Sequence, residues 1–143
     1  MRIGVRYLLR AADNPNEEYN EGPYLLGMLQ ADLQPDMKLP KDLMLSDVRE
    51  ARRNLDKAAA LGHGDARYRL GWAYEFGELG LPGSDPKISF ELYRLAAVEN
   101  HHTEAMMGLS GWYLTGVEEW FEPNEQLAFE CKFYPIYLPC LMD

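Results

Sequence analysis

The side chains in this sequence that could carry out chemistry are histidines, clustered carboxylates and serine hydroxyls. His101 and His102 are adjacent, and neighbouring residues do not share a helix face, so they are poorly placed to bind one metal ion together. Glu118, Glu119 and Glu122 form an acidic loop, but no histidine or further acid is fixed opposite them for acid–base catalysis. The serines lie in no nucleophile motif, and the glycines lie in no phosphate-binding loop. We therefore expect no catalytic, metal or cofactor site, and we expect that the protein is not an enzyme.

Length and charge narrow the class of protein. The chain has 143 residues, of which 47% are hydrophobic, and this is enough for one folded domain with a sizeable core. Its formal net charge is −9, and no basic patch with interleaved aromatic residues is present. Nucleic-acid binding depends on neutralising phosphates with lysine and arginine. We therefore expect protein partners and no nucleic acid.

The cysteines and the apolar runs bear on where the protein works. Cys131 and Cys140 form neither a disulfide framework nor a metal-spaced cluster, so a reducing, cytoplasmic compartment is expected. No apolar run approaches the ~18–20 residues of a membrane span. Three arginines within the first ten residues argue against a signal peptide. The end of the chain, Cys140–Asp143, has the outline of a prenylation box, but aspartate is not a usual last residue there.

The elements that position these side chains follow an internal repeat of 39 residues. The first members of the repeated pairs are Ala66, Leu70, Tyr74, Gly77, Ile88 and Phe90, and the second members are Ala105, Leu109, Tyr113, Gly116, Leu127 and Phe129. Alanine pairs at 11–12, 58–59 and 96–97 extend the pattern towards the N-terminus. A period of this length indicates a stacked array in which each unit buries its apolar face on its neighbours.

Capping residues predict where the helices begin and end. Asp47, Asp85, Thr103 and Asn124 each precede a helical apolar pattern and are good N-caps. Gly62 can supply the left-handed residue that ends a helix. Helices are therefore expected over about 23–33, 47–61, 65–77, 85–99 and 103–116, and from 124 onward. His63 and His101 fall between units, and there we expect them to hydrogen-bond the helix ends.

The two ends of the chain are expected to be incomplete. Tyr7–Asn14 is typical of the end of a helix that lacks a preceding partner, so residues 1–22 are interpreted as a partial unit. The following units are expected at about 23–64, 65–103 and 104–132, with an apolar extra loop at 35–45. Pro135 and Pro139 exclude a continuing regular helix. Residues 133–143 are therefore interpreted as a divergent C-terminal tail.

These residues together resemble the Sel-one-like repeat family, which is related to the tetratricopeptide repeat. The resemblance is carried by Ala66, Leu70-Gly71, Tyr74, Gly77, Asp85, Ala96-Ala97 and Asn100-His101, and by the run Ala58-Ala59-Ala60-Leu61-Gly62-His63. It covers most of the chain, although Ser110 stands where glycine is usual. The resemblance implies an all-α, right-handed solenoid of antiparallel helix pairs, with about three units. It also implies a non-catalytic, protein-binding scaffold or adaptor.

The seven-residue loop after Gly77 and the run 108–116 are similar to the fungal branch of this family that includes chitin synthase regulators. This resemblance implies a chitin synthase or a septation protein as partner. Other relatives imply an alternative, an adaptor in protein quality control linked to the endoplasmic reticulum. Bacterial relatives with cysteine-paired repeats imply a third, hydrolysis of β-lactams, but no cysteine lies between residues 1 and 130.

A candidate binding surface follows from helical periodicity. Tyr68, Trp72 and Glu75 project from the side of their helix opposite Leu70, at ~100° per residue. The matching positions of the next unit include Met107 and Leu114. First helices of such stacks line a concave surface that takes up partners. Two interpretations remain open, because Tyr68 and Met107 could instead pack against the neighbouring helix pair.

Overall fold

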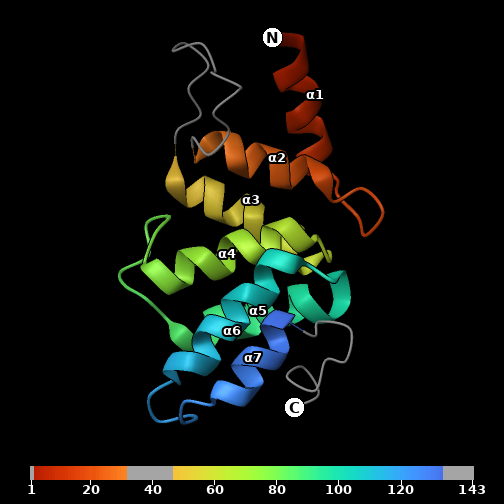
Figure 1. Cartoon of the computed structure of the whole chain (residues 1–143). Coiled ribbons are helices and arrows are strands. Elements are labelled where there is room, and N and C mark those ends of the chain that lie inside the picture. Colours follow the sequence, from red (N-terminus) through yellow and green to blue (C-terminus); the bar gives the residue numbers. More distant parts are fainter. Residues whose placement is uncertain (1, 32–46, 134–143) are drawn as a thin grey trace.

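The computed structural model describes residues 2–31 and 47–133, and their regular structure is almost entirely helical (Figure 1). The helices are α1 (Arg2–Asp13), α2 (Glu21–Gln30), α3 (Val48–Ala60), α4 (Gly64–Phe76), α5 (Pro86–Asn100), α6 (Thr103–Thr115) and α7 (Glu125–Phe133). Within these ranges the β-structure consists of one isolated bridge, between Val117 and Phe121. No helix among them is long and apolar enough to cross a membrane.

Consecutive helices pack as antiparallel pairs that are stacked along the molecule. The closest associations are α4 with α5, α2 with α3 and α6 with α7, and neighbouring pairs meet through α3 with α4 and α5 with α6. The first helices α4 and α6 also touch. Figure 1 shows the order of the stack from α1, in red, to α7, in blue. The fold is an all-α solenoid of the tetratricopeptide type, as the resemblance implied.

The predicted caps explain most helix ends. Asp47 accepts a hydrogen bond from the amide of Arg49, and Asp85 accepts one from the amide of Ile88. Asn124 accepts a bond of 3.0 Å from the backbone amide of Leu127. Gly62 has a φ of 90°, the left-handed conformation that a helix end favours and that glycine adopts without strain. These expectations from the sequence are confirmed.

Some boundaries differ from the prediction. The helix expected to end at Asn14 is α1, which begins at Arg2 and ends at Asp13. The next helix, α2, begins at Glu21 and ends at Gln30, a few residues earlier than expected, and Pro23 lies in its first turn as predicted. Thr103 is the first residue of α6 and not its cap, since His102 occupies the cap position. Cys131 is buried, whereas Cys140 lies outside the described residues. The extra loop at 35–45 and the proposed prenylation box lie outside the described residues.

The core is built from small residues that let the helices approach closely. Its fully buried positions include the alanines at 51, 58, 66, 96, 97 and 105 together with Leu55, Leu70 and Leu109. Tyr93 of α5 is the largest fully buried side chain, at 1% exposure. A Cβ atom built on Gly71 of α4 or on Gly108 of α6 would lie 2.6 Å from the Tyr93 ring. The ring therefore fills the space between two first helices at positions where only glycine leaves room.

Candidate partner-binding surface

A histidine at the start of α4 joins two successive units. His63 is the N-cap of α4, and its Nδ1 atom accepts a hydrogen bond of 3.2 Å from the amide of Ala66. Its Nε2 atom lies 2.7 Å from a carboxylate oxygen of Glu21, at the start of α2. Its ring stacks on Tyr24 with 4.3 Å between the centroids. An Nδ1 atom that accepts leaves Nε2 as the donor to Glu21, so one neutral ring can make both bonds.

The same arrangement recurs one repeat later, at His102 and not at His101. The Nδ1 atom of His102 accepts from the amide of Ala105 at 3.3 Å, and its Nε2 atom lies 2.7 Å from Asp65. The ring stacks on Tyr68 at 5.0 Å. His101 instead ends α5 in the left-handed conformation, with a φ of 51°. The backbone amide of His101 donates to the carbonyl oxygen of Ala96, so His101 does bond a helix end. The side-chain capping role of His63 belongs instead to His102, because His101 occupies the position that Gly62 has in the preceding unit.

Two residues of the candidate surface make contacts inside the protein. The Tyr68 ring lies between His102 and Tyr93, and its centroid is 5.8 Å from that of Tyr93. Glu75 accepts a hydrogen bond of 2.6 Å from the Tyr93 hydroxyl. Burial, followed by this hydrogen bond and the charge of Glu75, raises the pKa of Tyr93 far above its ordinary value. Tyr68 and Glu75 thus hold α4 and α5 together with the start of α6.

The other residues of the candidate surface lie open to solvent. The exposed fraction is 37% for Trp72, 55% for Met107 and 54% for Leu114. Phe76, which the sequence analysis did not select, is 55% exposed and packs on Trp72 with 4.6 Å between ring centroids. Its position one turn after Trp72 on the same helix was the signal that could have identified it. A Cβ atom added at Gly111 would meet no atom within 4 Å.

We call the set of exposed positions on the first helices α4 and α6 the first-helix face. It consists of Trp72, Phe76, Met107, Gly111 and Leu114. The face is carried by α4 and α6, which touch each other and hold the buried Tyr93 ring between Gly71 and Gly108. Exposed apolar residues that gather on neighbouring elements are typical of protein interaction sites, whereas scattered ones are ordinary.

The serine hydroxyls serve in packing between helices. Ser89 of α5 donates a hydrogen bond of 2.8 Å to the carbonyl oxygen of Gly71, and it accepts one from the Trp112 indole. Ser110 of α6 donates at 2.7 Å to the carbonyl oxygen of Ala128 in α7. The bonds donated by the two serines each join the two helices of one unit, whereas the bond from Trp112 joins α6 to α5 of the preceding unit. In the last unit the donor lies on the first helix, which explains why Ser110 is accommodated where the related repeats have glycine.

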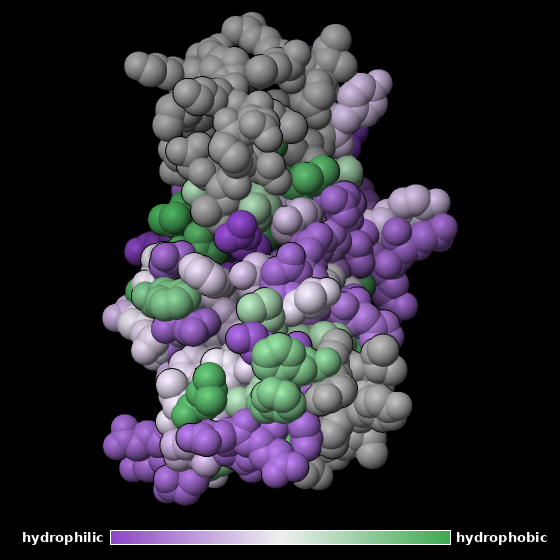
Figure 2. Space-filling view, in the orientation of Figure 1, coloured by the Kyte–Doolittle hydropathy of each residue, from purple (hydrophilic) through white to green (hydrophobic). Residues whose placement is uncertain are grey.

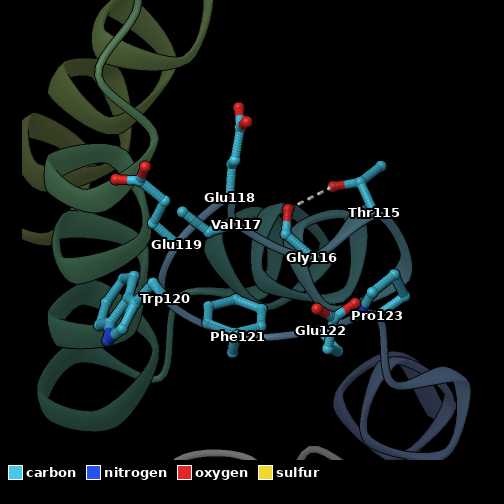
Figure 3. A pocket seen from close by; sticks show the side chains of 9 residues that line it. All are labelled: Thr115, Gly116, Val117, Glu118, Glu119, Trp120, Phe121, Glu122 and Pro123. Atoms are coloured by element: carbon cyan, nitrogen blue, oxygen red, sulfur yellow. Dashed lines mark hydrogen bonds between the residues drawn. The ribbon is translucent and has the colours of Figure 1, made fainter.

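The acidic loop between α6 and α7 borders a shallow pocket of about 470 Å³, which Figure 3 shows from close by. The side chains of Glu118, Glu119 and Glu122 point in different directions and do not converge on a common point (Figure 3). Trp120 packs edge-on against Phe90 of α5, with 5.0 Å between the ring centroids. The aromatic residues thus anchor the loop, while the carboxylates add negative charge to the surface beside α6.

The geometry defines a helical-repeat protein whose candidate site is an exposed apolar surface across successive first helices. The profile of the Sel1 repeat matches four stretches of the chain, at residues 1–16, 24–63, 64–101 and 103–131. The chain belongs to the Sel1 repeat family. This is the Sel-one-like family that the sequence resembles.

Several fungal proteins are similar to the chain over most of its length. The chitin synthase regulator SKT5 of Saccharomyces cerevisiae is 35% identical over 127 residues, which are 89% of this chain and 17% of that protein. The protein of the same name in Malassezia restricta is 33% identical over 81% of this chain and 8% of its own length. Chitin synthase regulatory factor 3 of Schizosaccharomyces pombe is 37% identical over 88% of this chain and 13% of its own length. The chain thus spans less than a fifth of these relatives, and no solved structure gives a significant match.

Proposed function

We propose that this chain is a non-catalytic, cytoplasmic interaction module that regulates or localises another protein, and that this protein is a chitin synthase. The observation that carries the proposal is the similarity, over more than four fifths of the chain, to proteins named as chitin synthase regulators. The repeat architecture supports the broader part of the proposal, since stacked helix pairs create extended surfaces that bind other proteins.

Within this proposal the partner-binding residues lie on the first-helix face. Trp72, Met107 and Leu114 would contact the partner, because they are exposed and apolar. Tyr68 and Glu75 would keep the face in shape through their contacts with His102 and Tyr93. We further propose that residues 1–132 form the repeat array, with a partial unit at 1–22 and units at about 23–64, 65–103 and 104–132. Residues 133–143 would be a divergent tail.

Co-precipitation tests this function. The tagged chain is produced in Saccharomyces cerevisiae cells in which each chitin synthase carries a second tag, and the precipitate is probed by immunoblotting. A Trp72→Ala/Leu114→Ala variant removes two exposed apolar side chains from the face. A control variant, Tyr7→Ala/Tyr19→Ala, removes two aromatic side chains elsewhere on the molecule that are more exposed than Trp72 and Leu114.

We expect one chitin synthase to be recovered with the unmodified chain and with the control, and to be lost with the face variant. Recovery with all three proteins would contradict the placement of the site on the first-helix face. Recovery of no chitin synthase with the unmodified chain would contradict the proposed regulatory target.

A further inference from the structure

We propose that the first-helix face receives a basic amphipathic segment of the protein partner, with its apolar side chains against Trp72, Met107 and Leu114 and its lysines or arginines towards the carboxylates around the face. This inference rests on the proposed function, and it adds the chemistry of the segment that binds.

The first argument is the charge next to the face. The stretch from 103 to 131 carries α6, the following loop and most of α7, and it contains six glutamates but no lysine or arginine. The glutamates are Glu104, Glu118, Glu119, Glu122, Glu125 and Glu130. All but Glu130 are exposed. A segment that lies across α6 therefore enters a strongly negative surface, which favours a positively charged partner and repels an acidic one.

The second argument concerns the side of the face formed by α4. Burial raises the pKa of the Tyr68 hydroxyl, Arg69 lowers it, and the charges of Glu104 and Glu75 raise it further. The carboxylates of Glu104 in α6 and Glu75 in α4 therefore both act on the Tyr68 hydroxyl. Arg69 acts on the same hydroxyl with the opposite sign, and its effect is larger than that of either carboxylate alone. Both flanks of the first-helix face thus carry carboxylates.

The third argument is the shape of the face at Gly111. The glycine lies between Met107 and Leu114, which are both more than half exposed, and a Cβ atom on it would meet nothing within 4 Å. The missing side chain leaves a recess between two projecting apolar side chains. An apolar side chain of a partner helix can enter such a recess, in the manner of an amphipathic helix lying in a groove. Figure 2 shows hydrophobic side chains in small groups among hydrophilic ones over the C-terminal helices.

A second copy of this chain is a less suitable occupant. Each copy has a formal net charge of −9, so two copies that meet through an acid-flanked face repel each other. A nucleic acid is repelled for the same reason. A basic segment with an apolar side matches both properties of the surface.

The test uses two arginine substitutions that change the net charge equally. Gly111→Arg fills the recess and adds a positive charge on the face. Gly83→Arg makes the same change at a glycine in the loop between α4 and α5 that also has neither a positive φ nor a neighbour within 4 Å. The probes are two fluorescein-labelled 14-residue peptides that form amphipathic helices, one with leucine and lysine and one with leucine and glutamate. Binding is measured by fluorescence anisotropy at 50 and 300 mM NaCl.

We expect the lysine peptide to bind the unmodified chain, to bind Gly83→Arg within about threefold of it, and to bind Gly111→Arg at least tenfold more weakly. The affinity should fall between 50 and 300 mM NaCl, and the glutamate peptide should not bind. Equal weakening by both substitutions would show attraction to net charge alone and would overturn the proposal. Tight binding of the glutamate peptide, or no binding of the lysine peptide, would overturn it too. These peptides are not chitin synthase, so such failures would not change the co-precipitation result. The proposed function is therefore tested separately.

Discussion

Replacing Gly108 by alanine tests the packing that holds α4 against α6. A Cβ atom at this position would lie 2.6 Å from Cε2 and 2.7 Å from Cδ2 of Tyr93. The ring cannot move away, because a shift would drive its other edge towards Gly71, and its hydroxyl is bonded to Glu75 at 2.6 Å. The added methyl group must therefore displace a helix. Overpacking of this kind costs ~1–3 kcal/mol.

The substitution also has a favourable contribution, since alanine is better than glycine in a helix interior by up to ~1 kcal/mol. We therefore expect Gly108→Ala to lower the free energy of unfolding by about 1–2 kcal/mol, or the melting temperature by about 3–6 °C. Gly111→Ala is the matched control, because it lies one turn later on α6 and its Cβ atom would meet nothing within 4 Å. It should raise the free energy of unfolding by ~0.5–1 kcal/mol.

The assay is urea unfolding of both variants, followed by circular dichroism at 222 nm and by differential scanning calorimetry. A Gly108→Ala protein as stable as Gly111→Ala would refute the reasoning, because the Tyr93 ring would then have free space beside it. A double variant that also carries Tyr93→Ala provides an internal check. In that background the alanine at 108 should no longer be destabilising, since the atoms it meets are gone.

Three further predictions concern the same contacts. His102→Ala removes an N-cap and the bond to Asp65, so it should lower the free energy of unfolding by ~1–2 kcal/mol in urea titrations, and His102→Asn should lower it less. His101→Gly removes the strain of a non-glycine residue in the left-handed conformation, so it should raise the free energy of unfolding by ~1 kcal/mol. A decrease would contradict the assigned role. The raised pKa of Tyr93 means that the folded protein keeps this proton while the unfolded chain loses it, so stability falls as pH rises above about 10, by at most ~1.4 kcal/mol per pH unit. Tyr93→Phe should reduce that slope, as thermal melts between pH 9 and 11 can show.

The sequence was sufficient for the order of the helices because its signals there are local. A cap such as Asp85 acts on an amide three residues away, and Gly62 ends a helix by its own backbone conformation. The period of 39 residues then placed Ala66 and Ala105 at equivalent buried positions. The caps need only the neighbours of a residue along the chain, and the repeat needs only a comparison of the sequence with itself.

The sequence was insufficient where two units meet. The alanine pairs are 38 residues apart, whereas the capping histidines at 63 and 102 are 39 apart, so alignment on alanine assigned the capping role to His101. The single additional residue lies between Ala97 and His102. Periodicity also predicted that Tyr68 and Glu75 leave their helix on the outer side, but it could not predict that Tyr93 and His102 approach them there. Those contacts join residues 18 to 34 positions apart, and no local pattern encodes them.

The two histidine contacts have a mechanical consequence. Each one connects the beginning of a first helix to the beginning of the preceding first helix, through a carboxylate, a tyrosine ring and a helix-end amide. The two contacts therefore lie on the same edge of the stack, where the first helices begin. These contacts oppose the separation of successive units along that edge.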